Sequence, residues 1–191
     1  MAKHKIIPIV LLLLLLLFPV AISRSSFTNR KYENAELGIT LEIPGNWDLE
    51  VTERVLGLYL KPWNIDETKS SVSITIWAGG STETNLLIAL ANDIKRLKRV
   101  EHIEEVVYLH PPEEYFYNNY EAASVTIQVP ITSASSAQGS NPVLNRPMDI
   151  IVIRGDNHLI FVFVRKSNTE IFWNAQADSI VNSIKLVSQN E

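Results

Sequence analysis

The sequence predicts an α+β fold in which helices pack on an antiparallel sheet. Several short runs alternate apolar and polar side chains, which is the pattern of half-buried strands. Two longer segments repeat apolar residues every three or four positions, as helices do. These elements follow the order strands, helix, strands, helix, which points to an antiparallel sheet with helices packed on it. The 191 residues show no internal repeat and no second domain, so we expect one domain after a leader.

The first predicted strands lie early in the chain. Residues 39–43 alternate apolar and polar side chains, and a Pro-Gly-Asn turn at residues 44–46 ends the run. The next strand-like runs cover residues 55–60 and 72–77. The polar residues 64–71 between them favour a hairpin.

A change of period marks the first helix, at residues 85–100. Its apolar side chains form one stripe: Leu87, Leu90, Ala91, Ile94 and Leu97. Ser81 and Thr82 precede the helix and offer a capping hydroxyl. Four cations crowd its last turns, where they complement the helix dipole: Lys95, Arg96, Lys98 and Arg99. We interpret these cations as a solvated face, with contact to an anionic lipid headgroup or a protein as the alternative.

The second half of the chain repeats the order of strands and helix. A short strand at residues 106–109 is followed by a long strand-like run at residues 121–131. Residues 148–154 and 159–165 form the clearest hairpin of the sequence. Residues 132–147 are rich in Ser, Ala, Asn, Gly and Pro and predict an exposed loop.

A capping box at Ser167 and Glu170 predicts the start of the last helix. We expect this helix to end near Leu186. Its apolar positions predict five buried side chains: Ile171, Phe172, Ala175, Ile180 and Ile184.

One stretch gathers groups that could bind a metal ion. His110, Glu113 and Glu114 lie within five residues, but Pro111 and Pro112 place them in an irregular loop. We interpret the stretch as a solvated loop. The sequence contains no G-x-S-x-G motif and no other nucleophile–base pattern, so it predicts no catalytic residue, no metal site and no cofactor.

The aromatic residues Tyr115, Phe116, Tyr117 and Tyr120 form the strongest candidate for contact with a partner. Aromatic side chains are enriched at recognition surfaces because they bury much area at low entropic cost. The alternative is that every second ring enters the core as the chain begins its long strand. The sequence leaves both interpretations open.

The first 23 residues read as a secretory signal peptide or an N-terminal membrane anchor. Lys3 and Lys5 form a basic start, and an apolar run covers residues 6–22. This run is at the lower limit for a spanning helix, which needs roughly 17–25 apolar residues, and the Ala-Ile-Ser sequence that ends the leader suits cleavage. Both alternatives place the domain outside the cytoplasm, secreted or periplasmic if cleaved and anchored if not. Residues 24–31 are polar and predict a tether.

Composition excludes several classes of protein. The chain has no cysteine, so it has no disulfides, no thiolate metal site and no lipid-modified cysteine at a mature N-terminus. Its net charge of −4 weighs against nucleic acid as a partner.

Residues 32–47 resemble the opening of PsbP-like domains. In that superfamily a tyrosine-bearing strand is followed by a strand with Gly near its start and by a Pro-x-x-Trp turn, and Tyr32, Gly38, Pro44 and Trp47 match this pattern. The superfamily includes the extrinsic photosystem II subunit PsbP and related bacterial envelope proteins. The resemblance implies an α/β/α sandwich with a central antiparallel sheet flanked by helices, as a single domain over residues 32–188. It implies no binding residue.

These observations favour an exported, non-enzymatic envelope protein whose domain binds a protein partner or supports an assembly. The expected contacts are the aromatic run of residues 115–120 and the loop at residues 132–147. Residues 6–22 would keep the protein near the membrane if the leader is not cleaved. A small-ligand binding module with a cleft between sheet and helix is the alternative, and a hydrolase is a third hypothesis that lacks a catalytic constellation.

Overall fold

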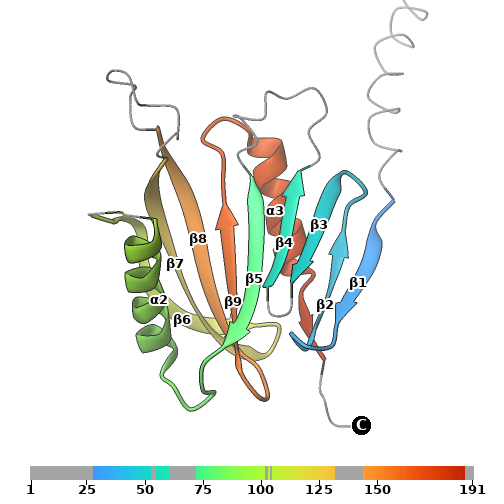
Figure 1. Cartoon of the computed structure of the whole chain (residues 1–191), viewed down its shortest axis with the longest axis horizontal. Helices are drawn as coiled ribbons and strands as arrows, with labels where there is room; N and C mark the ends of the chain where they lie inside the picture. Colours follow the sequence, from blue (N-terminus) through green and yellow to red (C-terminus); the bar gives the residue numbers. More distant parts are fainter. Residues whose placement is uncertain are drawn as a thin grey trace, which may run out of the picture.

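The computed structural model describes residues 28–52, 55–60, 72–101, 103, 105–131 and 144–187. Over these residues the chain forms antiparallel sheets and two helices (Figure 1). The prediction of an α+β chain with antiparallel strands is confirmed, although the strands form two sheets rather than one central sheet. The predicted leader, residues 1–23, lies outside the described residues, and so does most of the loop predicted at residues 132–147.

The small sheet joins the two ends of the described chain. Its order is β1 (Arg30–Asn34), β2 (Ile39–Ile43) and β10 (Lys185–Leu186), with β2 in the middle. Gly38 has a φ of 63° in the turn before β2, a conformation that glycine adopts without strain. The carbonyl of Gly38 accepts a hydrogen bond from the N–H of Val187 at 2.8 Å, which fixes the C-terminal strand beside this turn.

The large sheet has the order β3-β4-β5-β9-β8-β7-β6. Its strands are β3 (Trp47–Thr52), β4 (Val55–Leu60), β5 (Ser73–Gly79), β6 (Val107–Tyr117), β7 (Tyr120–Ile131), β8 (Leu144–Arg154) and β9 (Leu159–Arg165). The two predicted hairpins are confirmed, because β4 pairs with β5 and β8 pairs with β9 in antiparallel register. β8 begins at Leu144, inside the segment that was expected to be a loop.

Strand β6 corrects the loop predicted around His110. Pro111 and Pro112 lie within this strand, which is the last strand of the large sheet. An edge strand tolerates proline because one row of its backbone groups has no partner strand. The register also shifts on both sides of His110, as it does at β-bulges, and bulges accept residues that regular pairing would reject.

Helix α2 (Leu86–Val100) confirms the first predicted helix, but a different residue caps it. The side chain of Asn85 accepts the N–H of Ile88 at 3.1 Å. The hydroxyl of Ser81 instead accepts the N–H of Glu83 at 3.2 Å, in the turn before the helix. The prediction that Ser81 or Thr82 caps the helix is therefore wrong, because the side chain of Asn85 caps it instead.

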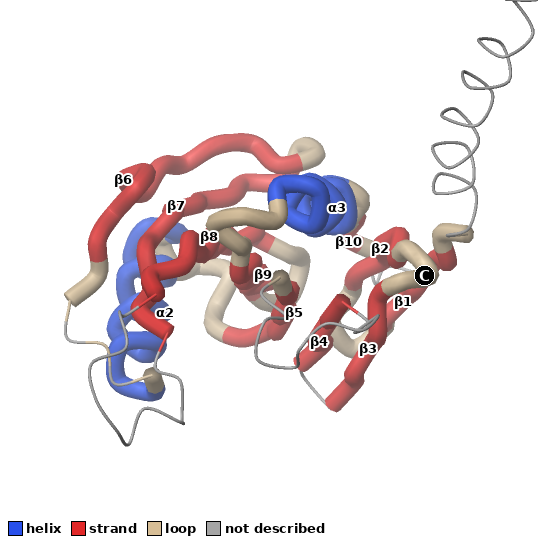
Figure 2. The backbone as a smooth tube through the Cα atoms, turned by 90° about the horizontal axis from the view of Figure 1, so that it is seen from above, coloured by secondary structure: helices blue, strands red, loops and turns tan. Residues whose placement is uncertain are grey.

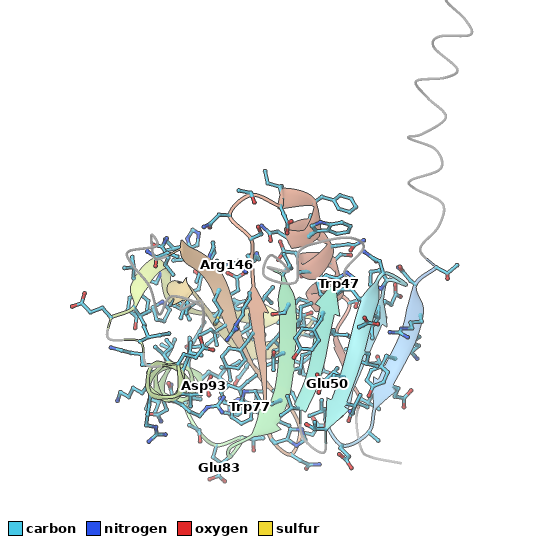
Figure 3. All side chains as sticks on the ribbon, turned by 45° about the horizontal axis from the view of Figure 1, so that its top comes forward. Trp47, Glu50, Trp77, Glu83, Asp93 and Arg146 are labelled. Atoms are coloured by element: carbon cyan, nitrogen blue, oxygen red, sulfur yellow. The ribbon has the colours of Figure 1, made fainter. Side chains whose placement is uncertain are left out.

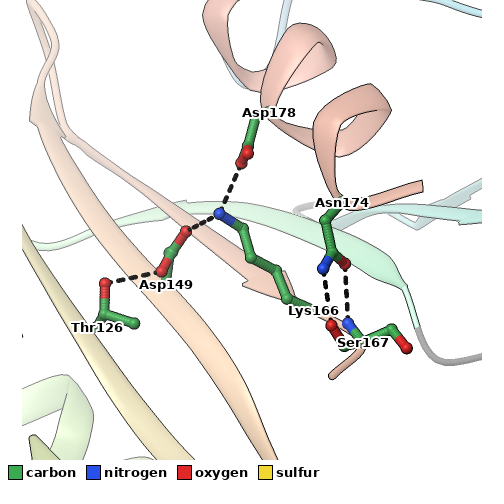
Figure 4. Close-up of polar contacts among 6 residues, drawn as sticks. All are labelled: Thr126, Asp149, Lys166, Ser167, Asn174 and Asp178. Atoms are coloured by element: carbon green, nitrogen blue, oxygen red, sulfur yellow. Dashed lines mark hydrogen bonds and ion pairs between the residues drawn. The ribbon is translucent and has the colours of Figure 1, made fainter. Parts of the chain in front are cut away.

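Helix α3 (Ile171–Asn182) begins later and ends earlier than predicted. Of the side chains predicted to be buried, Ile180 and Ile184 are buried, and Ile184 lies after the end of the helix. The hydroxyl of Ser167 accepts the N–H of Glu170 at 3.2 Å, but Ser167 lies outside the helix. The Asn174 side chain bonds both the N–H and the C=O of Ser167, at 2.8 and 2.7 Å (Figure 4), which holds this segment as a separate turn. Ile171 and Phe172, which were expected to be buried, are 78% and 65% exposed.

Side chains along β9 alternate between two buried clusters. Ile160, Val162 and Val164 belong to one cluster together with residues of β2 and α3, which we call the α3-side core. Leu159, Phe161 and Phe163 belong to the other, together with residues of α2, which we call the α2-side core. Since successive side chains of a strand point to opposite faces, α2 and α3 pack on opposite faces of the large sheet (Figure 2).

Candidate functional site

Helix α2 covers only part of its face of the large sheet. It packs against β6, β7 and β8, while β9, β5 and β4 extend beyond it (Figure 1). The space between the helix and these strands forms a groove with a volume of about 540 Å³. Val55 of β4 and Val100 of α2 both line it. We call this site the α2 groove.

The floor of the α2 groove is aromatic and apolar. Trp77 lies in β5 at the same side of the strand as Thr75, and both line the groove with Phe163 and Met148. Trp77 stacks on Phe161, its direct cross-strand neighbour, with ring centroids 4.1 Å apart and planes 6° from parallel. Such cross-strand aromatic pairs stabilise a sheet and make its surface rigid.

The wall of the groove is a charged segment of α2 that is fixed to this floor. The guanidinium carbon of Arg96 lies 4.5 Å from the centroid of the Trp77 ring, a cation–π contact. Because Phe161 stacks on one face of the indole, Arg96 covers the other face. Arg96 Nε also pairs with Asp93 Oδ1 at 2.8 Å. Figure 3 shows Asp93 and Trp77 where the helix meets the sheet.

Asp93 is an unusual residue for this position. Its side chain is 4% exposed, and Oδ2 has no hydrogen-bond partner. Burial raises the pKa of Asp93, and the hydrogen bond and charge of Arg96 oppose that rise. The charged form of the Asp93 carboxylate is therefore stabilised by Arg96. The same ion pair holds the Arg96 side chain in its position at the groove.

A second ion pair joins two residues that line the groove. Arg165 at the end of β9 pairs with Glu101, the residue that follows α2. The lining thus holds two guanidinium groups and one carboxylate beside apolar side chains. An apolar floor with a polar rim is the usual composition of a binding surface.

Gly79 makes room for the Trp77 ring. A Cβ atom at Gly79 would lie 2.6 Å from Cζ3 of Trp77. The indole therefore lies along its own strand, over the glycine. A larger residue at position 79 would push the ring away from Phe161 and Arg96.

The structure separates the four aromatic residues that the sequence singled out. Tyr117 is 9% exposed and donates its hydroxyl hydrogen to the carbonyl of Val181 in α3. Burial raises the pKa of Tyr117 to about 12. Tyr115 and Tyr120 pack against the α3-side core, while Phe116 is 76% exposed. Alternate rings thus enter the core, and contact with a partner through these residues stays a prediction.

The other sequence candidates do not converge. His110, Glu113 and Glu114 are exposed along β6. Among the described residues, no group of three or more His, Asp or Glu side chains could hold a metal ion. The same part of the chain contains no helix that is both long and apolar enough to cross a membrane.

Sequence reasoning missed Trp77 and Arg96 as members of one site. A signal was present, because Trp77 occupies the side of its strand where Ser73 and Thr75 would suggest a polar surface. An indole on a polar strand face would be exposed to water unless another element covered it, and here Arg96 of α2 covers it. The pairing itself could not be foreseen, since the two residues come from different elements.

No protein-family model matches the sequence, and no curated protein matches it. Solved structures do match the fold. The solution structure of cyanobacterial PsbP from Synechocystis has 8% sequence identity, a TM-score of 0.56, and coverage of 83% of this chain and 92% of its own. The Ran-binding protein Mog1p from Saccharomyces cerevisiae has 13% identity, a TM-score of 0.53, and coverage of 85% and 97%.

At these identities the likeness concerns the fold and covers most of each chain. Of the positions that carried the resemblance, Gly38 has a positive φ in the turn before β2, and Trp47 is fully buried in the α3-side core. The chain has a PsbP-like fold.

Proposed function

We propose that this chain is an exported, non-enzymatic module that binds a protein partner through the α2 groove. The observation that carries the proposal is the half-covered face of the large sheet, where α2 leaves β9, β5 and β4 beside an open groove. A relative in fold, Mog1p, is named as a Ran-binding protein, so this fold supports protein binding elsewhere.

The rim of the groove presents apolar side chains that a partner could cover. Val100 is 66% exposed and Val55 is 39% exposed, on opposite sides of the groove. Arg96 and Arg165 supply hydrogen-bond donors beside them. An apolar segment of a partner would bury the valines against the rigid Trp77 surface, and its carbonyl or carboxylate oxygens would accept from the guanidinium groups.

A matched pair of variants in α2 tests this proposal. Val100→Glu places a charge at the rim, and Ile88→Glu places the same charge on the same helix outside the groove, at a position that is 57% exposed. Pull-downs from membrane extracts should recover one stoichiometric partner with the wild type and with Ile88→Glu, and lose it with Val100→Glu. Equal recovery with both variants would exclude the groove as the contact surface.

A small-ligand binding module is the second candidate, because the groove volume falls within the range of about 300–1,000 Å³ that is typical of small-molecule sites. A thermal-shift screen tests it, since a ligand at 100 times its Kd adds about 2.7 kcal/mol to stability. The shift should disappear in Val100→Glu and persist in Ile88→Glu. A ligand that stabilises both variants equally would bind elsewhere.

The proposed organisation keeps the leader at residues 1–23 and one domain outside the cytoplasm. The tether predicted at residues 24–31 is shortened to residues 24–29 and the domain predicted at residues 32–188 is extended to begin at residue 30, because β1 starts at Arg30. Export is supported by the order of basic start, apolar run and small residues in the leader. The α/β/α sandwich is supported by the two cores on opposite faces of the large sheet. Of the aromatic run, Phe116 is the member whose exposure suits a second partner contact.

A further inference from the structure

The first turn of α3 exposes large apolar side chains that the fold does not use. Ile171 is 78% exposed and Phe172 is 65% exposed. The Phe172 ring meets the Trp173 ring edge to face, with centroids 4.7 Å apart, and Trp173 packs against the α3-side core. The exposed Phe172 ring is therefore held in place by Trp173. We call Ile171, Phe172 and Trp173 the α3 tip.

Hydrogen bonds connect the α3 tip to the start of the folded chain. Gln176 lies one helical turn after Phe172, and its side-chain oxygen accepts the indole N–H of Trp47 at 2.8 Å. The carbonyl of Trp47 in turn accepts a hydrogen bond from Arg30 at 3.1 Å. Arg30 is the first residue of β1, so the first strand and the α3 tip lie at the same end of the domain (Figure 1).

The length of chain before Arg30 limits how far this end can lie from the leader. Eight peptide steps separate Ile22, the last residue of the apolar run, from Arg30. Because a fully extended chain spans at most about 3.5 Å per residue, this distance cannot exceed about 28 Å. A leader embedded in a bilayer would therefore hold the end of the domain that carries the α3 tip close to the membrane surface.

We propose that the leader is retained as an anchor and that the α3 tip inserts into the interface of the same bilayer. Aromatic and large aliphatic side chains are the groups that bind this interface. The proposal rests on the export proposed above, but it does not depend on the α2 groove.

Charges near the tip favour an apolar contact over an electrostatic one. Lys166 is bound on two sides, by Asp149 at 2.7 Å and Asp178 at 2.8 Å (Figure 4). These three residues carry a net charge of −1, and Glu170 next to Ile171 is a further negative charge. Together they outweigh the positive charge of Arg30 at the same end of the domain, so the tip presents no excess cation to an anionic headgroup. Insertion of the tip should therefore be similar in neutral and anionic membranes. Binding through the exposed cations of α2, Lys95 and Arg99, would instead require anionic lipid.

The absence of cysteine from the chain allows a direct test. The variant Phe172→Cys carries a polarity-sensitive fluorophore at the tip, and Phe116→Cys carries it at a matched aromatic position. Phe116 is 76% exposed. The next residue, Tyr117, bonds the carbonyl of Val181 near the end of α3, so Phe116 lies away from the tip, which is at the start of this helix. The full chain is reconstituted into phosphatidylcholine vesicles, with and without phosphatidylglycerol. The label at position 172 should show a blue shift and brighter emission in both lipids, and the label at position 116 should match its emission in water.

Three results would overturn the proposal. One is equal, water-like emission from both positions in the vesicle-bound protein. Another is a response at position 172 that requires phosphatidylglycerol, or a stronger response from Lys95→Cys, because either would place the cationic face of α2 on the membrane. The third is a full chain that does not sediment with vesicles, which would exclude the anchor. The Val100→Glu pull-down tests the groove separately, so the two proposals can fail independently.

Discussion

Gln176→Met should destabilise the domain by about 2 kcal/mol, because Gln176 is a shared acceptor for two nearly buried donors. Its side-chain oxygen lies 2.8 Å from Nε1 of Trp47 and 3.0 Å from Nδ2 of Asn46. Trp47 is fully buried, and Asn46 is 8% exposed. Methionine keeps nearly the same volume, so the change removes the acceptor without opening a large cavity.

The magnitude follows from the two donors. A buried donor left without a partner costs about 1–3 kcal/mol, and the indole N–H of Trp47 has no route to water. Asn46 is 8% exposed, and its bond to Gln176 is longer than that of Trp47, 3.0 Å against 2.8 Å, so we assign its donor less than about 1 kcal/mol. Gln176→Glu keeps an acceptor at the same place and should lose less stability than Gln176→Met.

Urea unfolding of five proteins tests the prediction: the wild type, Gln176→Met, Gln176→Glu, Trp47→Phe and the double variant Trp47→Phe/Gln176→Met. With a slope of roughly 2 kcal/mol per molar urea, Gln176→Met should lower the midpoint by about 1 M. In a Trp47→Phe background, where the indole donor is absent, the same change should cost less than half as much. A wild-type midpoint for Gln176→Met, or an equal cost in both backgrounds, would refute the reasoning.

Two further changes probe other parts of the structure. Lys166→Met should lower stability at pH 7 by about 1–2 kcal/mol, because Asp149 and Asp178 lose their shared cation. The loss is smaller than for a fully buried ion pair, because all three side chains are partly exposed. Burial lowers the pKa of Lys166, but the two carboxylates outweigh it and raise that pKa above 10.5. The native state thus holds this proton more tightly, and wild-type stability should fall as pH rises from 10.5 through the folded pKa. A urea series above pH 10 should show a smaller fall for the variant. Gly79→Ala should cost about 1–3 kcal/mol and change tryptophan fluorescence, since the new Cβ displaces the Trp77 ring. Gly57→Ala is its control, because that Cβ meets the ring of Tyr59, which is 41% exposed and can turn away. Equal stability losses for the two alanine variants would contradict the proposed fixation of Trp77.

The sequence predicted best where local pattern and tertiary packing agree. β8 and β9 form a hairpin because both runs are apolar and a Gly-Asp-Asn-His turn separates them. The period also predicted helix α2, and two residues of the predicted stripe, Leu90 and Ile94, are buried. Leu87 and Ala91 of that stripe are exposed, because the helix turns Leu86, Ala89 and Asp93 toward the sheet instead.

Prediction failed where sequence signals describe a local preference that tertiary contacts override. Pro111 and Pro112 argue against a central strand, but β6 is an edge strand with shifted register, where that argument does not hold. Ser167 and Glu170 match a capping box, yet Asn174 holds Ser167 in a separate turn before the helix.

The candidate site was less predictable than the fold. The aromatic run at residues 115–120 drew attention because its residues are adjacent in sequence, and three of its rings pack into or against the core. Trp77, Arg96 and Val100 line one groove because β9 pairs between β5 and the strands that α2 covers, β8, β7 and β6. No pattern within a single segment could reveal that contact.

The central position of β2 in the small sheet sets a limit on when this protein can finish folding. β2 pairs with β1, the first described strand in the chain, and with β10, the last described strand. The N–H of Glu42 also bonds the hydroxyl of Ser183, 141 residues later. During synthesis, one edge of β2 therefore stays unpaired until residues 185–186 have been made. A chain stopped before Lys185 would keep an open strand edge, and such edges are where aggregation begins.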